Sequence, residues 1–97
     1  MKNSFIYMLS NKRRSMLYIG VTSNLYRRIV EHKSGKGSIF TEKYSIKDLL
    51  YFEEFTSIDQ AIMREKQLKN WHKEWKWNLI KQVNPELKDL FEDLTPN

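Results

Sequence analysis

The stretch that decides the fold is Ser4-Phe5-Ile6-Tyr7-Met8-Leu9, followed after six residues by Met16-Leu17-Tyr18-Ile19-Gly20-Val21. Both runs are rich in aromatic and branched apolar residues, so each predicts a β-strand. The segment 10–15 between them is polar and basic, which is typical of a turn. We therefore expect a β-hairpin at the start of the chain.

The register of this hairpin decides which side chains meet. If it is symmetric about Lys12 and Arg13, Tyr7 lies directly opposite Tyr18 on one face of the sheet. A four-residue loop over 11–14 keeps that register, whereas a two-residue turn is disfavoured because neither Lys12 nor Arg13 favours a positive φ. Two tyrosine hydroxyls on one face could form a polar site, although strand tyrosines also serve packing alone.

The pattern of the remaining residues predicts mainly helices. Ser23-Asn24 and Ser57-x-x-Gln60 are helix-capping signals, and each precedes a segment with helical apolar periodicity. A separate apolar run predicts a third strand, and Asn84-Pro85 marks the end of the last long helix. The expected helices are 25–33, 57–71, 73–82 and a short one within 85–92, with the strand at 49–52 and a flexible basic loop at 34–38. The predicted fold class is α/β (α+β), with a small, mainly antiparallel three-stranded sheet flanked by three or more helices.

Composition bounds the class of protein. The 97 residues suffice for one domain, taken as 1–97, with an ordinary balance of 40% apolar and 30% charged residues. The absence of cysteine excludes a disulfide framework, a thiol nucleophile and a thiolate zinc site. The N-terminal apolar run, 5–9, is too short for a signal peptide or a membrane span. We expect a soluble, cytoplasmic protein without a membrane partner.

Charge is unevenly distributed along the chain. Residues 1–50 carry ten Lys/Arg and three Asp/Glu, a balance of +7, whereas residues 51–97 carry seven and nine, a balance of −2. A basic half is typical of a face that meets a polyanion, and the cations of the hairpin turn and Lys36 could contact phosphates. An unevenly charged, solvated surface would give the same count.

Glu65 is the least expected residue of the longest predicted helix. It falls inside an apolar stripe of three- and four-residue spacing made by Ile58, Ala61, Ile62 and Leu68. A carboxylate facing a core is costly unless it is paired or binds a cation. Either a Lys/Arg partner or a metal ion would satisfy it, and the residues alone favour the ion pair.

Five elements, in order, resemble the GIY-YIG nuclease family. Phe5-Ile6-Tyr7, ten intervening residues and Tyr18-Ile19-Gly20 resemble its paired tripeptides. Arg28, eight residues past Gly20, and His32, one turn later, match its first helix. Ala61 to Glu65 resembles the helix that carries its metal-binding glutamate, and Asn84-Pro85 resembles the C-terminal segment of small bacterial members. Phe5 departs from the pattern, because it stands where the family's name has glycine.

The resemblance implies an endonuclease that hydrolyses DNA phosphodiester bonds with one Mg²⁺ or Mn²⁺ held by Glu65, in a structure-specific role in DNA repair or recombination. Tyr18 would be the general base, Tyr7 would orient the water, Arg28 would bind the scissile phosphate, and His32 would bond to a tyrosine or move a proton. The implied catalytic residues are therefore Tyr7, Tyr18, Arg28, His32 and Glu65. The expected DNA contacts are Arg13, Arg14, Arg27, Lys36, Tyr44 and Asn84.

Three other functions stay open at this point. A non-catalytic DNA-binding module could keep the fold, but binding alone needs no helix-borne glutamate facing the core. A protein–protein adaptor could use the aromatic C-terminal half as its contact surface. An enzyme that cleaves RNA would be separated by a test with matched RNA and DNA. Substrate structure, oligomeric state and protein partners are likewise open.

Overall fold

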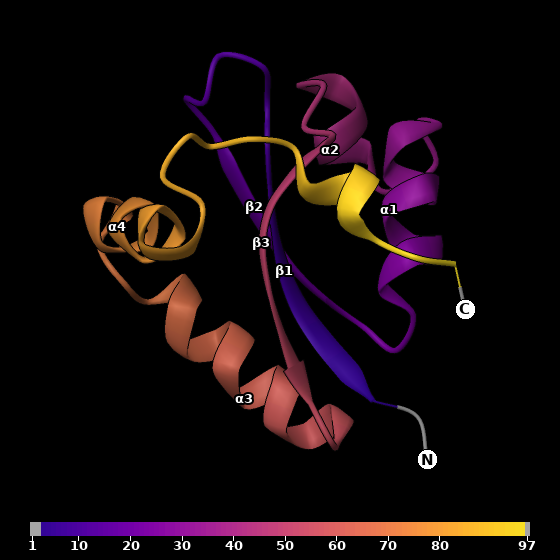
Figure 1. Ribbon diagram of the computed structural model, residues 1–97, viewed down its shortest axis with the longest axis vertical. Helices are drawn as coiled ribbons and strands as arrows, with labels where there is room; N and C mark the ends of the chain where they lie inside the picture. Colours follow the sequence, from indigo (N-terminus) through magenta and orange to yellow (C-terminus); the bar gives the residue numbers. More distant parts are fainter. Residues whose placement is uncertain (1–2, 97) are drawn as a thin grey trace.

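A computed structural model describes residues 3–96 and contains one antiparallel sheet (Figure 1). Its strands are β1 (Ser4–Ser10), β2 (Leu17–Thr22) and β3 (Asp48–Phe55), in the order β2-β1-β3. The central strand β1 pairs antiparallel with both neighbours. The predicted fold class is confirmed, and β3 extends beyond the four residues expected for it.

Helices cover both faces of the sheet (Figure 1). One face carries α1 (Leu25–Lys33), α2 (Ile39–Lys43) and the 3₁₀ turn η1 (Leu90–Asp93). The opposite face carries α3 (Ile58–Lys69) and α4 (Lys73–Val83). The predicted helices 25–33, 57–71 and 73–82 correspond closely to α1, α3 and α4. Helix α2 was not predicted, and the expected helix within 85–92 is reduced to η1.

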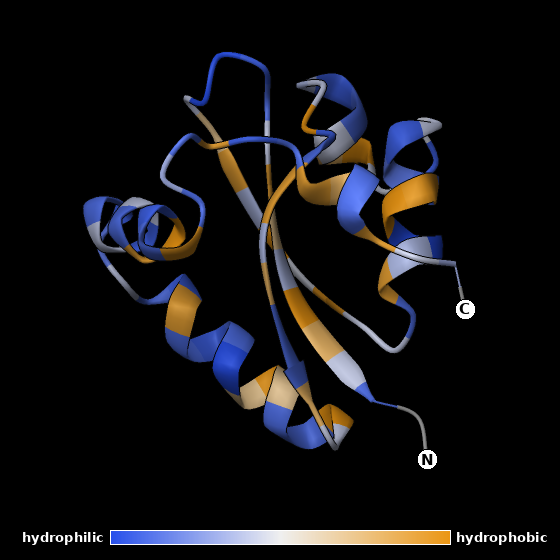
Figure 2. Cartoon of the chain, viewed as in Figure 1, coloured by the Kyte–Doolittle hydropathy of each residue, from blue (hydrophilic) through white to orange (hydrophobic). Residues whose placement is uncertain are grey.

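Alternation along β1 divides the core into two layers. Ile6 and Met8 pack with residues of α3 and α4, while Tyr7 and Leu9 pack with α1. Figure 2 shows the apolar residues concentrated in the sheet and on the helix faces turned toward it. A strand buried on both faces needs few polar positions, which explains the continuous apolar run of β1. None of the helices in the described part of the chain is long and apolar enough to cross a membrane.

The predicted hairpin register is wrong by two residues. Tyr7 pairs with Gly20, and Tyr18 pairs with Leu9. The loop is longer than expected because the Asn11 side-chain oxygen accepts the backbone N–H groups of Ser15, at 2.9 Å, and Met16, at 3.1 Å. A shift of two residues keeps every side chain on its face. The two tyrosines therefore share a face as predicted, but as diagonal rather than direct neighbours.

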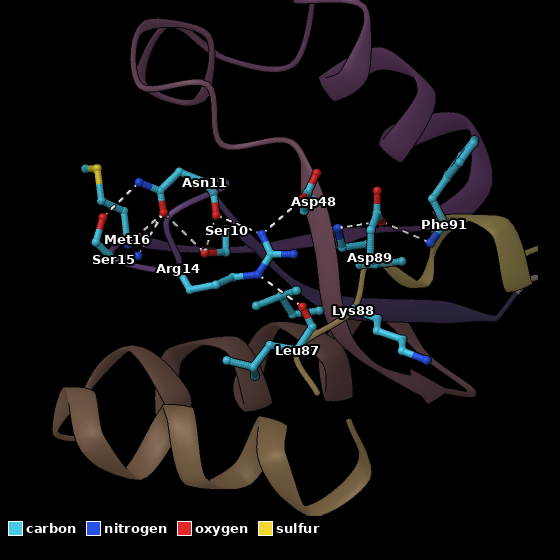
Figure 3. Close-up of polar contacts among 12 residues, drawn as sticks. Ser10, Asn11, Arg14, Ser15, Met16, Asp48, Leu87, Lys88, Asp89 and Phe91 are labelled. Carbon is cyan, nitrogen blue, oxygen red and sulfur yellow. Dashed lines mark hydrogen bonds and ion pairs between the residues drawn. The ribbon is translucent and has the colours of Figure 1, made fainter. Parts of the chain in front are cut away.

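Arg14 ties this loop to the rest of the fold (Figure 3). Its Nη1 donates to Asp48 Oδ2 and to the Asn11 carbonyl, both at 2.8 Å, and its Nε donates to the Leu87 carbonyl at 3.1 Å. Arg14 itself has a positive φ of 56°. The Asp48 side chain is only 9% exposed, so its charge depends on this pairing. The loop, β3 and the C-terminal segment are thus joined by one guanidinium.

Candidate active site

Tyr7 and Tyr18 are brought together over Gly20. Their ring centroids lie 6.3 Å apart, on the face covered by α1. A Cβ atom at position 20 would overlap the Cζ and hydroxyl oxygen of Tyr7. Glycine is therefore required at this position because the Tyr7 ring lies across its backbone. The second tripeptide supplies both a tyrosine and the space for the tyrosine of the first.

Helix α1 presents two further polar side chains to Tyr7. It begins where the Asn24 side chain accepts the Arg27 N–H, and its buried residues Leu25 and Ile29 hold it against the sheet. Arg28 and His32 are one turn apart and so face the same way. Arg28 Nε donates to the Tyr7 hydroxyl at 3.3 Å, and His32 Nε2 lies 3.0 Å from the same oxygen.

The Arg28 guanidinium is held on three sides. Besides Tyr7, its Nη1 donates to Glu31 Oε1 at 3.0 Å and its Nη2 donates to the Gly37 carbonyl at 3.1 Å. The bond to Tyr7 and the pairing with Glu31 keep the pKa of Arg28 above its usual range. The hydrogen bond from Arg28 also lowers the pKa of the partly exposed Glu31 carboxyl. Arg28 is thus a fixed cation whose side chain is 29% exposed.

His32 is a buried, neutral imidazole. It is 1% exposed, and burial, together with the charge of Arg28, lowers its pKa to about 4. Its Nδ1 lies 3.2 Å from the hydroxyl oxygen of Thr41, in α2. A Cβ at Gly37 would overlap the His32 ring, so the loop before α2 passes closely over the imidazole. Both ring nitrogens therefore have a protein partner.

The two tyrosines differ in access to solvent. Tyr7 is 1% exposed, and burial raises its pKa to about 12, so it stays protonated at neutral pH. Tyr18 is half-buried, with its ring centroid 5.6 Å from that of His32. Within residues 3–96, no hydrogen bond occupies the Tyr18 hydroxyl. Tyr7 is suited to holding other groups in place, whereas Tyr18 can meet a water molecule.

Glu65 lies apart from this cluster. It belongs to α3, which packs on the opposite face of the sheet, mainly against β1 and the edge strand β2. Its side chain is 18% exposed, and its carboxylate pairs with Lys69 one turn later at 2.9 Å. The expected stripe is only partly buried, since Ala61 and Leu68 are enclosed while Ile58 is 43% exposed. An ion pair thus meets the charge of Glu65, one of the two solutions predicted.

The donor set around Glu65 limits which metal could bind. Among the described residues there is no group of three or more His, Cys, Asp or Glu side chains placed to hold a metal ion. A single partly exposed carboxylate does not make a zinc site, which needs three or four protein ligands. It does fit Mg²⁺ or Mn²⁺, because such hard ions keep several waters and take substrate phosphate oxygens.

The expected DNA contacts divide into two groups. One group has exposed side chains, which are Arg13, Arg27, Lys36 and Tyr44. Arg14 is in the other group, because three of its five N–H donors bond to Asp48, Asn11 and Leu87. Asn84 is 5% exposed, and its amide nitrogen donates to the carbonyls of Leu50 and Lys88 at 3.0 and 2.8 Å. Arg14 and Asn84 thus join separate segments of the fold, and their roles as DNA contacts stay predictions.

Sequence reasoning missed the loop and short helix that complete the cluster. Thr41 and Gly37 contact His32, while Glu31 and Gly37 bond to Arg28. One signal was present, because Ser38 stands three residues before Thr41 and caps α2 by accepting its N–H at 3.1 Å. A five-residue helix shows no periodicity, so nothing in the pattern placed it near His32.

Comparisons with known proteins identify the family to which the chain is similar. The model of a family described as the GIY-YIG catalytic domain matches residues 3–78. A UPF0213 protein of Syntrophus aciditrophicus is 36% identical over 87 residues, which cover 89% of this chain and 98% of that protein. A UPF0213 protein of Staphylococcus haemolyticus is 33% identical over 82 residues, covering 84% of this chain and 99% of that protein.

A solved structure shares the fold. The solution NMR structure of a UPF0213 protein from Bacillus halodurans superimposes with a TM-score of 0.54 at 30% sequence identity. The match covers 84% of this chain and 86% of that one. The family match extends from β1 into α4 and includes both tripeptides, Arg28, His32 and Glu65. The chain therefore belongs to the GIY-YIG catalytic domain family, a family of nucleases.

Proposed function

We propose that this protein is a divalent-metal-dependent endonuclease that hydrolyses DNA phosphodiester bonds. The observation that carries the proposal is the shared bonding of Arg28 and His32 to the buried Tyr7 hydroxyl, with Tyr18 beside them. A binding module would need cations alone, whereas this cluster combines a fixed cation, a neutral imidazole and an accessible phenol. Those are the groups that acid–base chemistry on a phosphate requires.

Arg28 is the phosphate-binding group of the proposal. A guanidinium has five N–H donors in a planar fork. Tyr7, Glu31 and Gly37 each accept one of them, which leaves one N–H on each Nη nitrogen. These two N–H groups are available to donate to phosphate oxygens. Because the protein holds the fork in place, its charge can stabilise the developing negative charge without reorganisation.

Tyr18 is the proposed general base. Tyr18 would first release its hydroxyl proton to solvent, and the phenolate oxygen would then accept a proton from the attacking water, which would lie between Tyr18 and the phosphate on Arg28. The Tyr7–His32 pair positions Arg28 and borders the Tyr18 ring, with both tyrosine–histidine ring distances at 5.6 Å. His32, neutral and enclosed, accepts or passes a proton within this cluster.

Glu65 would hold the metal ion beside the edge strand β2, against which α3 packs. Mg²⁺ or Mn²⁺ would supply Lewis acidity that stabilises the leaving oxygen. The exposed side chains Arg13, Arg27, Lys36 and Tyr44 would contact the flanking strand. A substrate that crosses the β2 edge would meet groups from both faces of the sheet. For such a nuclease we expect a role in DNA repair or recombination in the cytoplasm.

The first test is a cleavage panel. Labelled linear, single-stranded, flapped and four-way-junction DNA, with matched RNA, would be incubated with Mg²⁺, with Mn²⁺ and with chelator. We expect cutting of DNA that stops when the metal is chelated. Binding without cutting under every metal condition would refute the enzyme and favour a DNA-binding module. The absence of both binding and cutting would favour the protein–protein adaptor. Preferential cutting of RNA would identify RNA, rather than DNA, as the substrate.

Arg28 gives the panel its most informative variant. We expect Arg28→Ala to lower the cleavage rate by about 100-fold or more, the usual cost of one preorganised charge donor. Affinity for DNA should fall much less, because Arg13, Arg27 and Lys36 remain. The exposed neighbour Arg27, changed to Ala, is the matched control and should affect binding and cutting alike. If Arg28→Ala lowered DNA affinity and the cleavage rate by the same factor, a role of Arg28 in the transition state would be refuted.

A further inference from the structure

Among residues 3–96, Thr41 supplies the hydroxyl that contacts His32 on the side away from Tyr7. Its side-chain oxygen lies 3.2 Å from His32 Nδ1, 2.9 Å from Ser38 Oγ and 3.3 Å from the Ser38 carbonyl. Thr41 is 2% exposed, so bulk water does not compete for these contacts. The single hydroxyl proton of Thr41 therefore has to choose among these three acceptors.

The surrounding bonds favour one arrangement of the protons. If the Thr41 hydroxyl donates to the Ser38 carbonyl, its oxygen is free to accept a proton from His32 Nδ1. His32 Nε2 is then bare and accepts the Tyr7 O–H, while the Tyr7 oxygen accepts Arg28 Nε–H. The Tyr7 and Thr41 hydroxyls then each donate one proton, and the Ser38 hydroxyl can donate its own to the Thr41 oxygen, which accepts from both Ser38 and His32. In the opposite tautomer both Arg28 and His32 would donate to Tyr7, whose own proton would have no partner among residues 3–96.

The segment around Thr41 is built to hold it in this place. Ser38 caps α2 and accepts the Thr41 N–H at 3.1 Å, which fixes the first turn of the helix. The Gly37 backbone passes so close to the His32 ring that no side chain fits there. The imidazole is thus confined between Tyr7, Thr41 and a glycine, with no room to rotate away from the Thr41 hydroxyl.

We propose that Thr41 is a positioning residue that keeps His32 in the Nδ1–H tautomer, so that Nε2 faces the Tyr7 hydroxyl as an acceptor. In a histidine, the hydrogen bond made by one ring nitrogen decides which nitrogen carries the proton. Thr41 thereby directs the Tyr7 proton toward His32, so that the Tyr7 oxygen presents a lone pair to Arg28 Nε–H and helps to hold the guanidinium in place. The catalytic consequence rests on the proposed function, whereas the tautomer does not.

The tautomer can be measured without any activity. Nitrogen-15 NMR distinguishes a protonated from a bare ring nitrogen, and the chain has two histidines, so His72→Gln leaves His32 as the only signal. At pH 7 we expect Nδ1–H in this background and with Thr41→Ser. Thr41→Val keeps the shape but would bury an unsatisfied Nδ1–H, so the proton should move to Nε2. An Nε2–H signal in the parent, or an unchanged signal in Thr41→Val, would overturn the proposal.

A cleavage assay gives the second readout. Thr41→Val should lower kcat by roughly 10- to 100-fold, part of what acid–base positioning contributes, with little change in KM, and Thr41→Ser should restore it. If Thr41→Val does not fold, Thr41→Ala in the same experiment must move the proton, or the proposal fails. An Nδ1–H signal in a protein that cuts no DNA would refute the proposed nuclease while leaving the positioning role of Thr41 standing.

Discussion

Acid should destabilise this protein through His32 well before its carboxylates are protonated. The pKa of His32 lies at about 4 in the folded protein, against about 6.5 for an unperturbed histidine, because the imidazole is buried beside Arg28. Between these values the unfolded chain binds the proton and the folded protein does not. Stability is therefore complete above pH 6.5 and falls as the pH drops toward 4. Between pH 7 and pH 5 the free energy of unfolding should fall by about 2 kcal/mol from this residue alone.

The window from pH 7 to pH 5 isolates His32 from the acidic side chains. Glu31, Glu53 and Asp89 have lowered pKa values, so the stability that they contribute is lost mostly below about pH 4.5. Urea denaturation across the window would be compared between the parent and His32→Gln, which should lack most of the slope. An NMR titration of the His32 ring in the His72→Gln background measures the pKa directly. Titration near 6.5, or equal slopes in both proteins, would refute a buried, neutral imidazole.

Two further substitutions test the packing that supports the site. Gly20→Ala places a methyl group where the Tyr7 ring lies, so stability should fall by about 1–3 kcal/mol and cleavage should be lost with the displaced hydroxyl; a variant of parental stability would show that the ring can move aside. Asp48→Asn removes the carboxylate 2.8 Å from Arg14 and should cost about 3 kcal/mol. The exposed carboxylate Glu86, changed to Gln as a control, should cost less than about 1 kcal/mol, and equal losses would contradict the importance of burial.

The elements of the fold could be predicted where local chemistry determines them. Asn24 and Ser57 cap α1 and α3 at the expected places, because a side-chain acceptor before an apolar-periodic segment is a local signal. The tyrosines share a face because side chains alternate between the two faces of a strand, so a register shift of two residues leaves each side chain on its face. Their register was wrong because it depends on how the Asn11 side chain closes a six-residue loop, which strand periodicity does not encode.

Residues of the candidate site could be named from the sequence, but the hydrogen-bond partners that hold them could not. The resemblance identified Tyr7, Arg28 and His32, and the structure brings them within hydrogen-bonding distance. The partners Thr41 and Gly37 lie on a loop and a five-residue helix whose position depends on tertiary packing. The separation of Glu65 from this cluster is likewise a tertiary property, because no local pattern specifies which face of the sheet a helix covers.

Single-turnover cleavage by Glu65→Gln would show whether a divalent ion held by this carboxylate is needed for DNA hydrolysis. The carboxamide keeps the size of the side chain but removes the charge that a divalent ion needs. The exposed Glu74, changed to Gln, is the control for loss of one negative charge. The proposed mechanism predicts that Glu65→Gln binds DNA at least as well as the parent and leaves it uncut in both Mg²⁺ and Mn²⁺, while Glu74→Gln cuts normally. A folded Glu65→Gln protein that cuts at the parental rate would contradict the metal-dependent nuclease.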